Sequence, residues 1–183
     1  NVERAIARLK AAAALDGASL RALPDATLAE LIRPAGYFNI KARRLKALCR
    51  YLADEDVLDA PERLADRADP MELRRRLLGV HGIGEETADC ILLYALDLPV
   101  FVVDAYTRRI FGRLGLLTGD ETYAEIQTLF HAHLPRNRAL FNEYHALIVQ
   151  LGKSVCRPRP KCAECPLLEC CGHPHITLDV NHA

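Results

Sequence analysis

The sequence predicts an all-α fold that ends in a small cysteine-rich segment. Apolar residues recur every three or four positions through most of the 183-residue chain, which is the spacing of an amphipathic helix. Runs that alternate valine or threonine with polar residues, as strands do, are few. Five of the seven cysteines fall between residues 156 and 171, after the last helical pattern. We therefore expect helices along the chain and a compact cysteine loop near its end.

The first third of the chain predicts three helices. The first covers residues 1–15, where alanine, leucine and isoleucine recur at helical spacing. The second covers 25–32, with Asp25 as its N-cap and Pro34–Gly36 as its stop. The third covers 41–52, and its apolar stripe lies opposite a basic one.

The rest of the chain continues the helical pattern. Residues 54–69 are acidic and predict a loop with one short helix. Asp69 followed by Pro70 is a typical helix start, because aspartate caps the free amides and proline fits the first turn. Further helices are expected over 85–96, 104–115, 121–133 and 138–151. Only 99–103 resembles a strand, and it has no partner strand.

Composition excludes several classes of protein. Half of the residues are hydrophobic and 26% are charged, so a fully disordered chain is excluded. No uncharged apolar run reaches 18 residues, so we expect no membrane helix, and we find no secretory signal. The net charge is zero, but the charges are segregated. Six cations and no acid lie in 31–53 (Arg33, Lys41, Arg43, Arg44, Lys46 and Arg50), and 153–163 holds Lys153, Arg157, Arg159 and Lys161. Such a pattern fits either a basic binding face or ordinary solvated helices.

A tight turn at Gly82-Ile83-Gly84 separates two predicted helices. Glycines let the chain turn sharply and let backbone amides approach a phosphate without obstruction by a Cβ. Seen alone, such a turn is as readily a plain connector between helices.

Asp104 follows an apolar run and opens the next helix. Amide donors and the helix dipole keep a carboxylate ionised at such a position. A fixed carboxylate can stabilise positive charge that develops on a sugar, or orient an attacking water. The alternative is an N-cap with only a structural role.

The cysteine loop has the composition of a metal site. Cys156, Cys162 and Cys165 are followed by the pair Cys170–Cys171. Two unstrained disulfides do not fit easily into so short a loop, and four thiolates suit a [4Fe–4S] cluster or zinc equally well.

Together these motifs resemble the endonuclease III superfamily of helix-hairpin-helix DNA glycosylases. HGIGEETA stands at the hairpin, VVDAYTRRI at the catalytic aspartate and YHALIVQLGKSVC before the cluster loop. IRPAGYFNIKARRLKAL is similar to a helix start of the family, and its sequence is nearest to that of the 3-methyladenine branch. The resemblance implies a helical barrel domain over 1–117, with the hairpin at about 73–96, and a second helical part over 118–183 that holds the loop 156–171. It also implies a further helix ahead of residue 1, which we expect to be absent from this chain.

The resemblance assigns roles to single residues. Asp104 becomes the catalytic carboxylate. DNA contacts are implied at Gly82, Ile83, Gly84, Thr87, Lys153, Arg157, Arg159 and Lys161. The cluster would be [4Fe–4S], held by Cys156, Cys162, Cys165 and Cys171; the family spacing favours Cys171 over Cys170. Glu86 stands where bifunctional members carry a lysine, and a carboxylate cannot form a Schiff base.

The function implied is hydrolysis of the N-glycosidic bond of a damaged base in duplex DNA, without strand cleavage. Two alternatives remain: an oxidised-pyrimidine glycosylase with lyase activity from another amine, and a damage-binding protein without catalysis. We expect a cytoplasmic monomer whose partner is damaged duplex DNA. His145, in an apolar helical run, is interpreted as a hydrogen-bonded core histidine.

Overall fold

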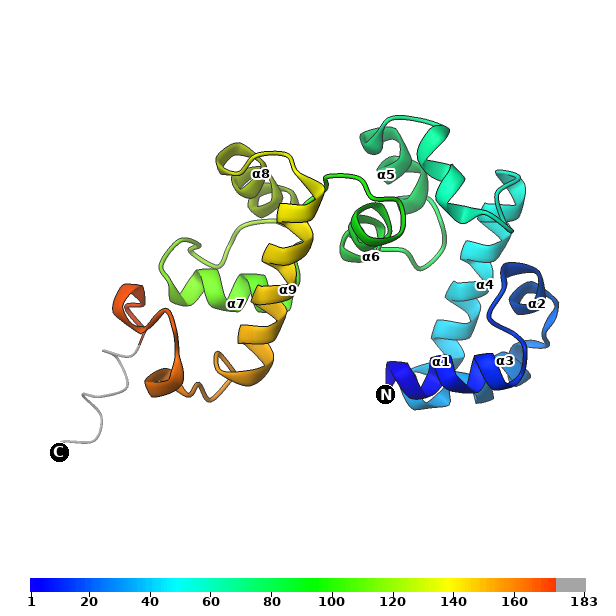
Figure 1. Cartoon of the computed structure of the whole chain (residues 1–183), viewed down its shortest axis with the longest axis horizontal. Helices are drawn as coiled ribbons and strands as arrows, with labels where there is room; N and C mark the ends of the chain where they lie inside the picture. Colours follow the sequence, from blue (N-terminus) through cyan, green and yellow to red (C-terminus); the bar gives the residue numbers. More distant parts are fainter. Residues whose placement is uncertain (174–183) are drawn as a thin grey trace. The chain divides into compact units, whose positions relative to one another are not determined.

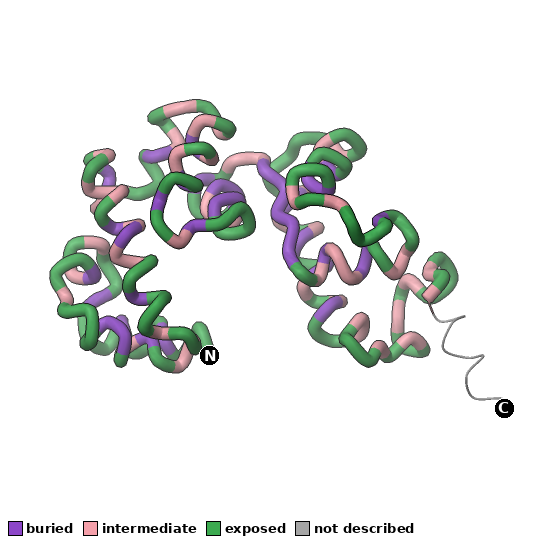
Figure 2. The backbone as a smooth tube through the Cα atoms, turned by 180° about the vertical axis from the view of Figure 1, so that it is seen from behind, coloured by how far each residue is buried: buried purple, intermediate pink, exposed green. Residues whose placement is uncertain are grey.

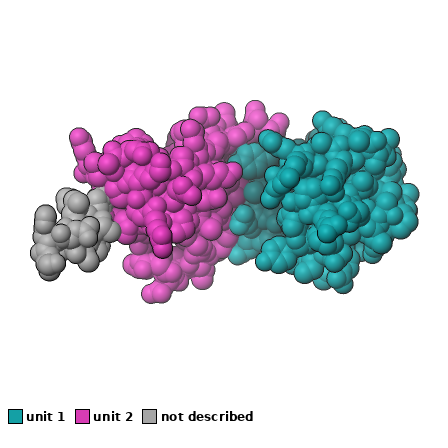
Figure 3. Space-filling model, turned by 90° about the horizontal axis from the view of Figure 1, so that it is seen from below, with its two compact units in different colours: residues 1–96 teal, residues 97–183 magenta. Residues whose placement is uncertain are grey.

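The computed structural model describes residues 1–173 and confirms the all-α prediction. Within that range the regular elements are helices and helical turns, and no strand is present (Figure 1). Contacts divide the chain into two compact units, residues 1–96 and 97–183 (Figure 3). The sequence analysis placed a boundary after residue 117 instead. Helix α7 (Ala105–Arg113), however, packs against α9 (Arg138–Ser154), so the contacts group 97–117 with the second unit. The last ten residues of the predicted second part, 174–183, lie outside the described range.

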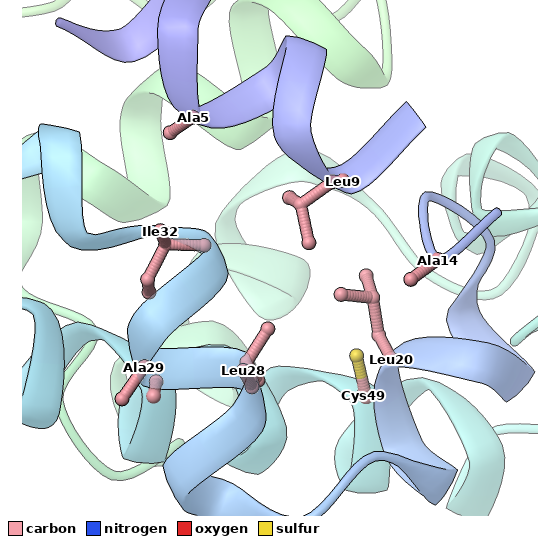
Figure 4. Close-up of a cluster of buried hydrophobic side chains, with 9 residues drawn as sticks. Ala5, Leu9, Ala14, Leu20, Leu28, Ala29, Ile32 and Cys49 are labelled. Atoms are coloured by element: carbon pink, nitrogen blue, oxygen red, sulfur yellow. The ribbon is translucent and has the colours of Figure 1, made fainter. Parts of the chain in front are cut away.

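The first unit begins with four helices around one apolar core. They are α1 (Val2–Ala11), α2 (Gly17–Ala22), α3 (Asp25–Leu31) and the long α4 (Phe38–Asp54). Leu9, Leu20, Leu28 and Ile32 point into this core, and the thiol of Cys49 joins them from α4 (Figure 4). Each of these side chains is less than 9% exposed, so the core accounts for the apolar spacing that predicted the helices.

Three details of this region differ from the prediction. The N-cap of α3 is Pro24, and Asp25 is the first helical residue, where its charge favours the helix dipole. Helix α2 was missed because its six residues hold a single buried side chain, Leu20, and six residues cannot display a helical period. Helix α1 also ends earlier than expected, at Ala11.

The first unit continues with a helical turn and two helices that flank the glycine turn. The short helix expected in the acidic region is a 3-10 helix, Pro61–Asp66. Helix α5 (Pro70–Leu78) starts as predicted: Asp69 accepts hydrogen bonds from the amides of Met71 and Glu72. Helix α6 (Glu85–Cys90) follows the glycine turn and runs into a π-helical turn, Ile91–Ala95.

The second unit is built from an extended segment and three helices, α7, α8 (Tyr123–His133) and α9. The extended segment, 100–103, is buried along its whole length, as the tube coloured by burial shows (Figure 2). Side chains of α8 take the place of a partner strand. His131 Nε2 accepts from the Phe101 amide (3.0 Å), Gln127 donates to the Phe101 carbonyl (2.7 Å), and Tyr123 accepts from the Val103 amide (3.2 Å). Side chains thus satisfy buried backbone groups and set the direction in which the chain enters α7.

No helix among the described residues is both long enough and apolar enough to cross a bilayer.

Candidate functional site

Asp104 lies at the exact point where the buried segment 100–103 becomes helix α7. It is the N-cap of α7, and its Oδ1 accepts hydrogen bonds from the amide (2.7 Å) and hydroxyl (2.9 Å) of Thr107. The Thr107 hydroxyl in turn lies 3.4 Å from the Asp104 amide, which completes a capping box. Asp104 is only 8% exposed and Thr107 is fully buried, so the carboxylate is held in one orientation.

The second oxygen of Asp104 faces a histidine. His145 Nε2, on α9, lies 3.6 Å from Asp104 Oδ2, and His145 is only 7% exposed. Burial by itself raises the pKa of Asp104. The His145 imidazole and the two hydrogen bonds from Thr107 outweigh burial, so the pKa of Asp104 lies below its ordinary value of 3.8. The result is a buried, ionised carboxylate with one oxygen committed to the helix cap and the other beside an imidazole.

His145 is buried, as the sequence suggested for a core histidine, but it also lies beside Asp104, the candidate catalytic carboxylate. The apolar helical run around it gave no signal of this, because the pairing depends on how α7 and α9 cross.

The glycine turn of the first unit has the conformation that its sequence predicts. Gly82 has φ of +86°, a value that side chains rarely adopt, and Gly84 is the N-cap of α6 without a capping side chain. Ile83 is buried at 9% exposure and anchors the turn. Thr87 is exposed in the first turn of α6. The turn thus presents exposed backbone and small side chains on a fixed base.

The carboxylates after this turn have different surroundings. Glu86 is exposed in the first turn of α6. Asp89 is fully buried, and Arg74 of α5 binds it through two hydrogen bonds (2.7 and 3.1 Å) and also reaches Glu85 (3.4 Å). This buried ion pair ties α5 to α6 and holds the hairpin together.

Four of the five clustered cysteines line one small cavity. These are Cys156, Cys162, Cys165 and Cys171, the four that the sequence analysis selected. Cys170 instead lines a different pocket, and its thiol contacts the Leu167 carbonyl at 3.3 Å. None of the cysteines forms a disulfide. Within residues 1–173, no three metal-ligating side chains gather closely enough to hold an ion. The four thiols nevertheless fit a thiolate-bound cluster in number, chemistry and common orientation toward one cavity.

Two arginines of α7 attach the cysteine loop to the helix that begins at Asp104. Arg109 donates to the carbonyls of Cys156 (2.8 Å) and Gly152 (2.9 Å). Arg113 donates to Cys156 Sγ (3.2 Å) and to the carbonyls of Arg157 (2.7 Å) and Pro158 (3.1 Å). This role was not predicted from the sequence, because each arginine and the group it binds lie more than forty residues apart along the chain.

The predicted cations of this loop are on the surface. Lys153, Arg157, Arg159 and Lys161 are all exposed, and within residues 1–173 only Lys161 forms an ion pair, with Glu164 at 3.4 Å. The second unit thus carries Asp104, the cysteine cavity and these cations, whereas the first unit carries the hairpin residues and Glu86.

The first unit also exposes an aromatic residue that the sequence analysis did not single out. Tyr37 is 84% exposed and has φ of +47°, at the N-cap of α4. A large ring on the surface in a strained backbone conformation is typical of functional positions.

A further cavity of the second unit lies away from Asp104 and His145. Its volume is about 560 Å³, and its lining is mostly apolar, with Phe111, Tyr144 and Leu147 among its members. Neither Asp104 nor His145 lines it.

Comparison with known families gives a match over most of the chain. Residues 1–136 match the model of the HhH-GPD superfamily of base excision DNA repair proteins. A protein of Methanocaldococcus jannaschii, provisionally named a DNA repair glycosylase, is 44% identical over 171 residues. The alignment covers 93% of this chain and 77% of that protein. Endonuclease III of Sulfolobus acidocaldarius is 33% identical over 146 residues, which cover 79% of this chain and 61% of that enzyme.

Solved structures show the same fold. A non-covalent complex of endonuclease III with DNA superposes with a TM-score of 0.75 at 25% identity, over 90% of this chain and 72% of the other. The 3-methyladenine DNA glycosylase of H. pylori, bound to 1,N6-ethenoadenine, superposes with a TM-score of 0.70 at 27% identity, over 82% of this chain and 75% of the other.

Proposed function

The chain belongs to the HhH-GPD superfamily of base excision DNA repair proteins, and we propose that it is a DNA glycosylase that removes a damaged base by hydrolysis without cutting the strand. The observation that carries the proposal is the state of Asp104. A buried carboxylate with a lowered pKa and two fixed oxygens is suited to stabilise positive charge on a reacting sugar.

The proposed reaction assigns Asp104 an electrostatic and a positioning role. Duplex DNA hides the bond between base and sugar, so the target nucleotide must first leave the stack. As the glycosidic bond breaks, positive charge develops on the deoxyribose, and the Asp104 carboxylate stabilises it. The same carboxylate orients the water that attacks the sugar. His145 and Thr107 keep the carboxylate ionised and in place throughout.

DNA binding is assigned to the hairpin and to the cations of the cysteine loop. Two of the matched relatives bear on this assignment: one solved structure is a complex with DNA, and another is a glycosylase with a modified base. In this chain the turn Gly82–Gly84, the exposed Thr87 side chain and the cations Lys153, Arg157, Arg159 and Lys161 are the groups suited to phosphates. Tyr37 is the exposed ring suited to stack against an unpaired base.

Hydrolysis without strand cleavage follows from the side chain at position 86. Strand cleavage by this class of enzyme starts with an amine that attacks the sugar and forms a Schiff base. Glu86 has no amine, and its carboxylate cannot take that part. Base release therefore leaves an intact strand with an abasic site.

The cysteine cavity is assigned to a [4Fe–4S] cluster. Cys156, Cys162, Cys165 and Cys171 would hold it, and it would cross-link a loop that few apolar contacts stabilise. Arg109 and Arg113 connect that loop to α7. The loop thereby holds its exposed cations at fixed positions for contact with phosphates.

The proposal is tested with duplexes that carry alkylated purines, oxidised pyrimidines or mismatches. Base release is measured directly, and strand cleavage is measured with and without hot alkali. We expect one lesion class to lose its base while the strand stays intact until alkali is added. Cleavage without alkali would instead support the alternative with lyase activity. Binding to lesions with no base release in any duplex would support the non-catalytic alternative.

A further inference from the structure

One cation of the first unit lies directly on the glycine turn. Arg44, on α4, packs its side chain against Gly82, although the two residues are far apart in sequence. A Cβ at position 82 would lie only 2.6 Å from Arg44 Cδ and 2.8 Å from Arg44 Nε. Two features therefore favour glycine at position 82. The turn has a positive φ, and the Arg44 side chain occupies the space that a Cβ would need.

Arg44 has no protein partner for its charge. Among residues 1–173 it takes part in no ion pair and no side-chain hydrogen bond, and it is exposed. Neighbouring cations of the same helix are engaged. Lys46 pairs with Asp25 (3.1 Å), Lys41 donates to the Ala35 carbonyl (2.6 Å), and Arg43 donates to the Asn39 carbonyl (3.4 Å).

Two acids next to the turn are bound by another arginine. Asp89 and Glu85 both pair with Arg74, and the Asp89 pair is buried. The turn therefore lies beside an exposed guanidinium that forms no ion pair within residues 1–173, and such a group favours an anion. The stem of Arg44 is pinned by contact with Gly82, so less conformational entropy is lost when the guanidinium binds.

We infer that Arg44 binds a phosphodiester of the DNA backbone beside the one held by the glycine turn, so that the phosphate site of the first unit is composed of the turn and α4 together. This inference rests on the proposed function, because it takes duplex DNA as the ligand. It adds a residue that the family motif at 82–87 does not contain, supplied by a helix outside the hairpin.

The experiment compares Arg44→Met with Arg50→Met in the full chain. Methionine keeps an apolar stem over Gly82 and removes the charge. Arg50 is the matched control, because it is exposed on the same helix, forms no ion pair or side-chain hydrogen bond within residues 1–173, and lies six residues away, about 9 Å along the axis. Binding to a duplex with a tetrahydrofuran abasic site is measured by fluorescence anisotropy across a series of salt concentrations.

We expect Arg44→Met to weaken binding about three- to tenfold near physiological salt and to lower the slope of log K against log salt by about 0.9. Arg50→Met should bind within about twofold of the wild type, and Arg44→Lys should keep most of the slope. Equal losses in the two methionine variants, or an unchanged Arg44→Met, would overturn the inference while the proposed function stands. A wild type that does not bind the duplex would overturn both.

Discussion

In the proposed reaction, Asp104 is the residue that acts on the sugar. Its carboxylate caps α7 through Thr107 and faces His145, so the helix cap fixes the geometry of the proposed catalytic group. A purely structural cap would need only one oxygen and no imidazole beside the other. This pairing of structural and chemical roles gives two predictions.

The first concerns Asp104→Asn. Asparagine keeps the acceptor oxygen for Thr107 and loses the charge, so we expect the fold and DNA affinity to persist. Base release in single-turnover assays should fall by about 10²–10³-fold. Wild-type rates in the variant would refute the assignment of Asp104 as the catalytic carboxylate.

The second concerns His145→Leu. Burial raises the pKa of Asp104, and His145 and Thr107 lower it; removing the imidazole leaves burial less opposed, so the pKa rises. Because a carboxylate with a lowered folded-state pKa loses its ionised form as pH falls through that value, the acidic limb of the excision profile should move to higher pH in the variant. We also expect kcat to fall by about 10- to 100-fold, with KM little changed.

The control for this prediction is His133→Leu, an exposed histidine of α8 in the same unit. It should keep the wild-type pH profile. An acidic limb in His145→Leu that coincides with that of His133→Leu would mean that His145 has no influence on Asp104.

At the scale of elements, side chains of α8 supply the hydrogen-bonding partners of the extended segment 100–103. Gln127 donates to the buried Phe101 carbonyl, and His131 accepts from the Phe101 amide. These bonds fix the segment that delivers Asp104 to the start of α7. The rings of Phe101 and Phe130 also stack, with centroids 3.8 Å apart, so α8 holds the segment by packing as well.

Gln127→Leu should therefore destabilise the fold by about 1–3 kcal/mol, because the Phe101 carbonyl loses its partner inside the core. Urea unfolding followed by circular dichroism measures this free energy. Gln150→Leu on α9 serves as the control, since Gln150 is exposed, and should change stability by no more than about 0.5 kcal/mol. Equal effects of the two substitutions would contradict the role given to Gln127.

The cysteine loop gives a matched pair of variants at adjacent positions. Cys171 lines the cavity with three other thiols, whereas Cys170 lines another pocket. We expect Cys171→Ser to lower the iron content and the visible absorption of anaerobically purified protein, and Cys170→Ser to leave both unchanged. Iron loss in Cys170→Ser alone would reverse the ligand assignment, and zinc without iron in the wild type would refute the cluster.

At the scale of the whole molecule, the proposed activity needs residues of both units. Glu86 and the glycine turn belong to the first unit, and Asp104 and the cysteine loop belong to the second. Although the net charge is zero, exposed cations that form no ion pair within residues 1–173 occur in both units, on α4 and in the cysteine loop.

The wild type should release a base from its lesion duplex and give no covalent adduct when borohydride is present. The reason is the missing amine at position 86, without which no Schiff base forms by that route. Denaturing gels of protein mixed with labelled duplex and borohydride measure the adduct. Efficient trapping would show that another amine attacks the sugar, with Lys41 and Lys153 as the first candidates for substitution.

The sequence by itself determined the helical architecture and the positions of the main caps and turns. Helical spacing located α4, α5, α7, α8 and α9, and turn chemistry located Asp69, Gly82 and the start of α7, because caps and glycine turns depend on neighbouring residues. The cysteine spacing of the family that the sequence resembles also selected the four cysteines that line one cavity. Signals of this kind are local and can be read along the chain.

The tertiary structure alone decided the pairings between distant residues. His145 beside Asp104, Arg44 across Gly82, and Arg113 on Cys156 join residues between 38 and 43 positions apart. Each pairing depends on how two elements pack against each other, which hydrophobic spacing does not encode, because spacing defines the face of a helix but not its partner. The same reason explains why residues 99–103 resembled a strand that lacked a partner strand. The hydrogen-bonding partners of this segment are side chains of a helix more than twenty residues away.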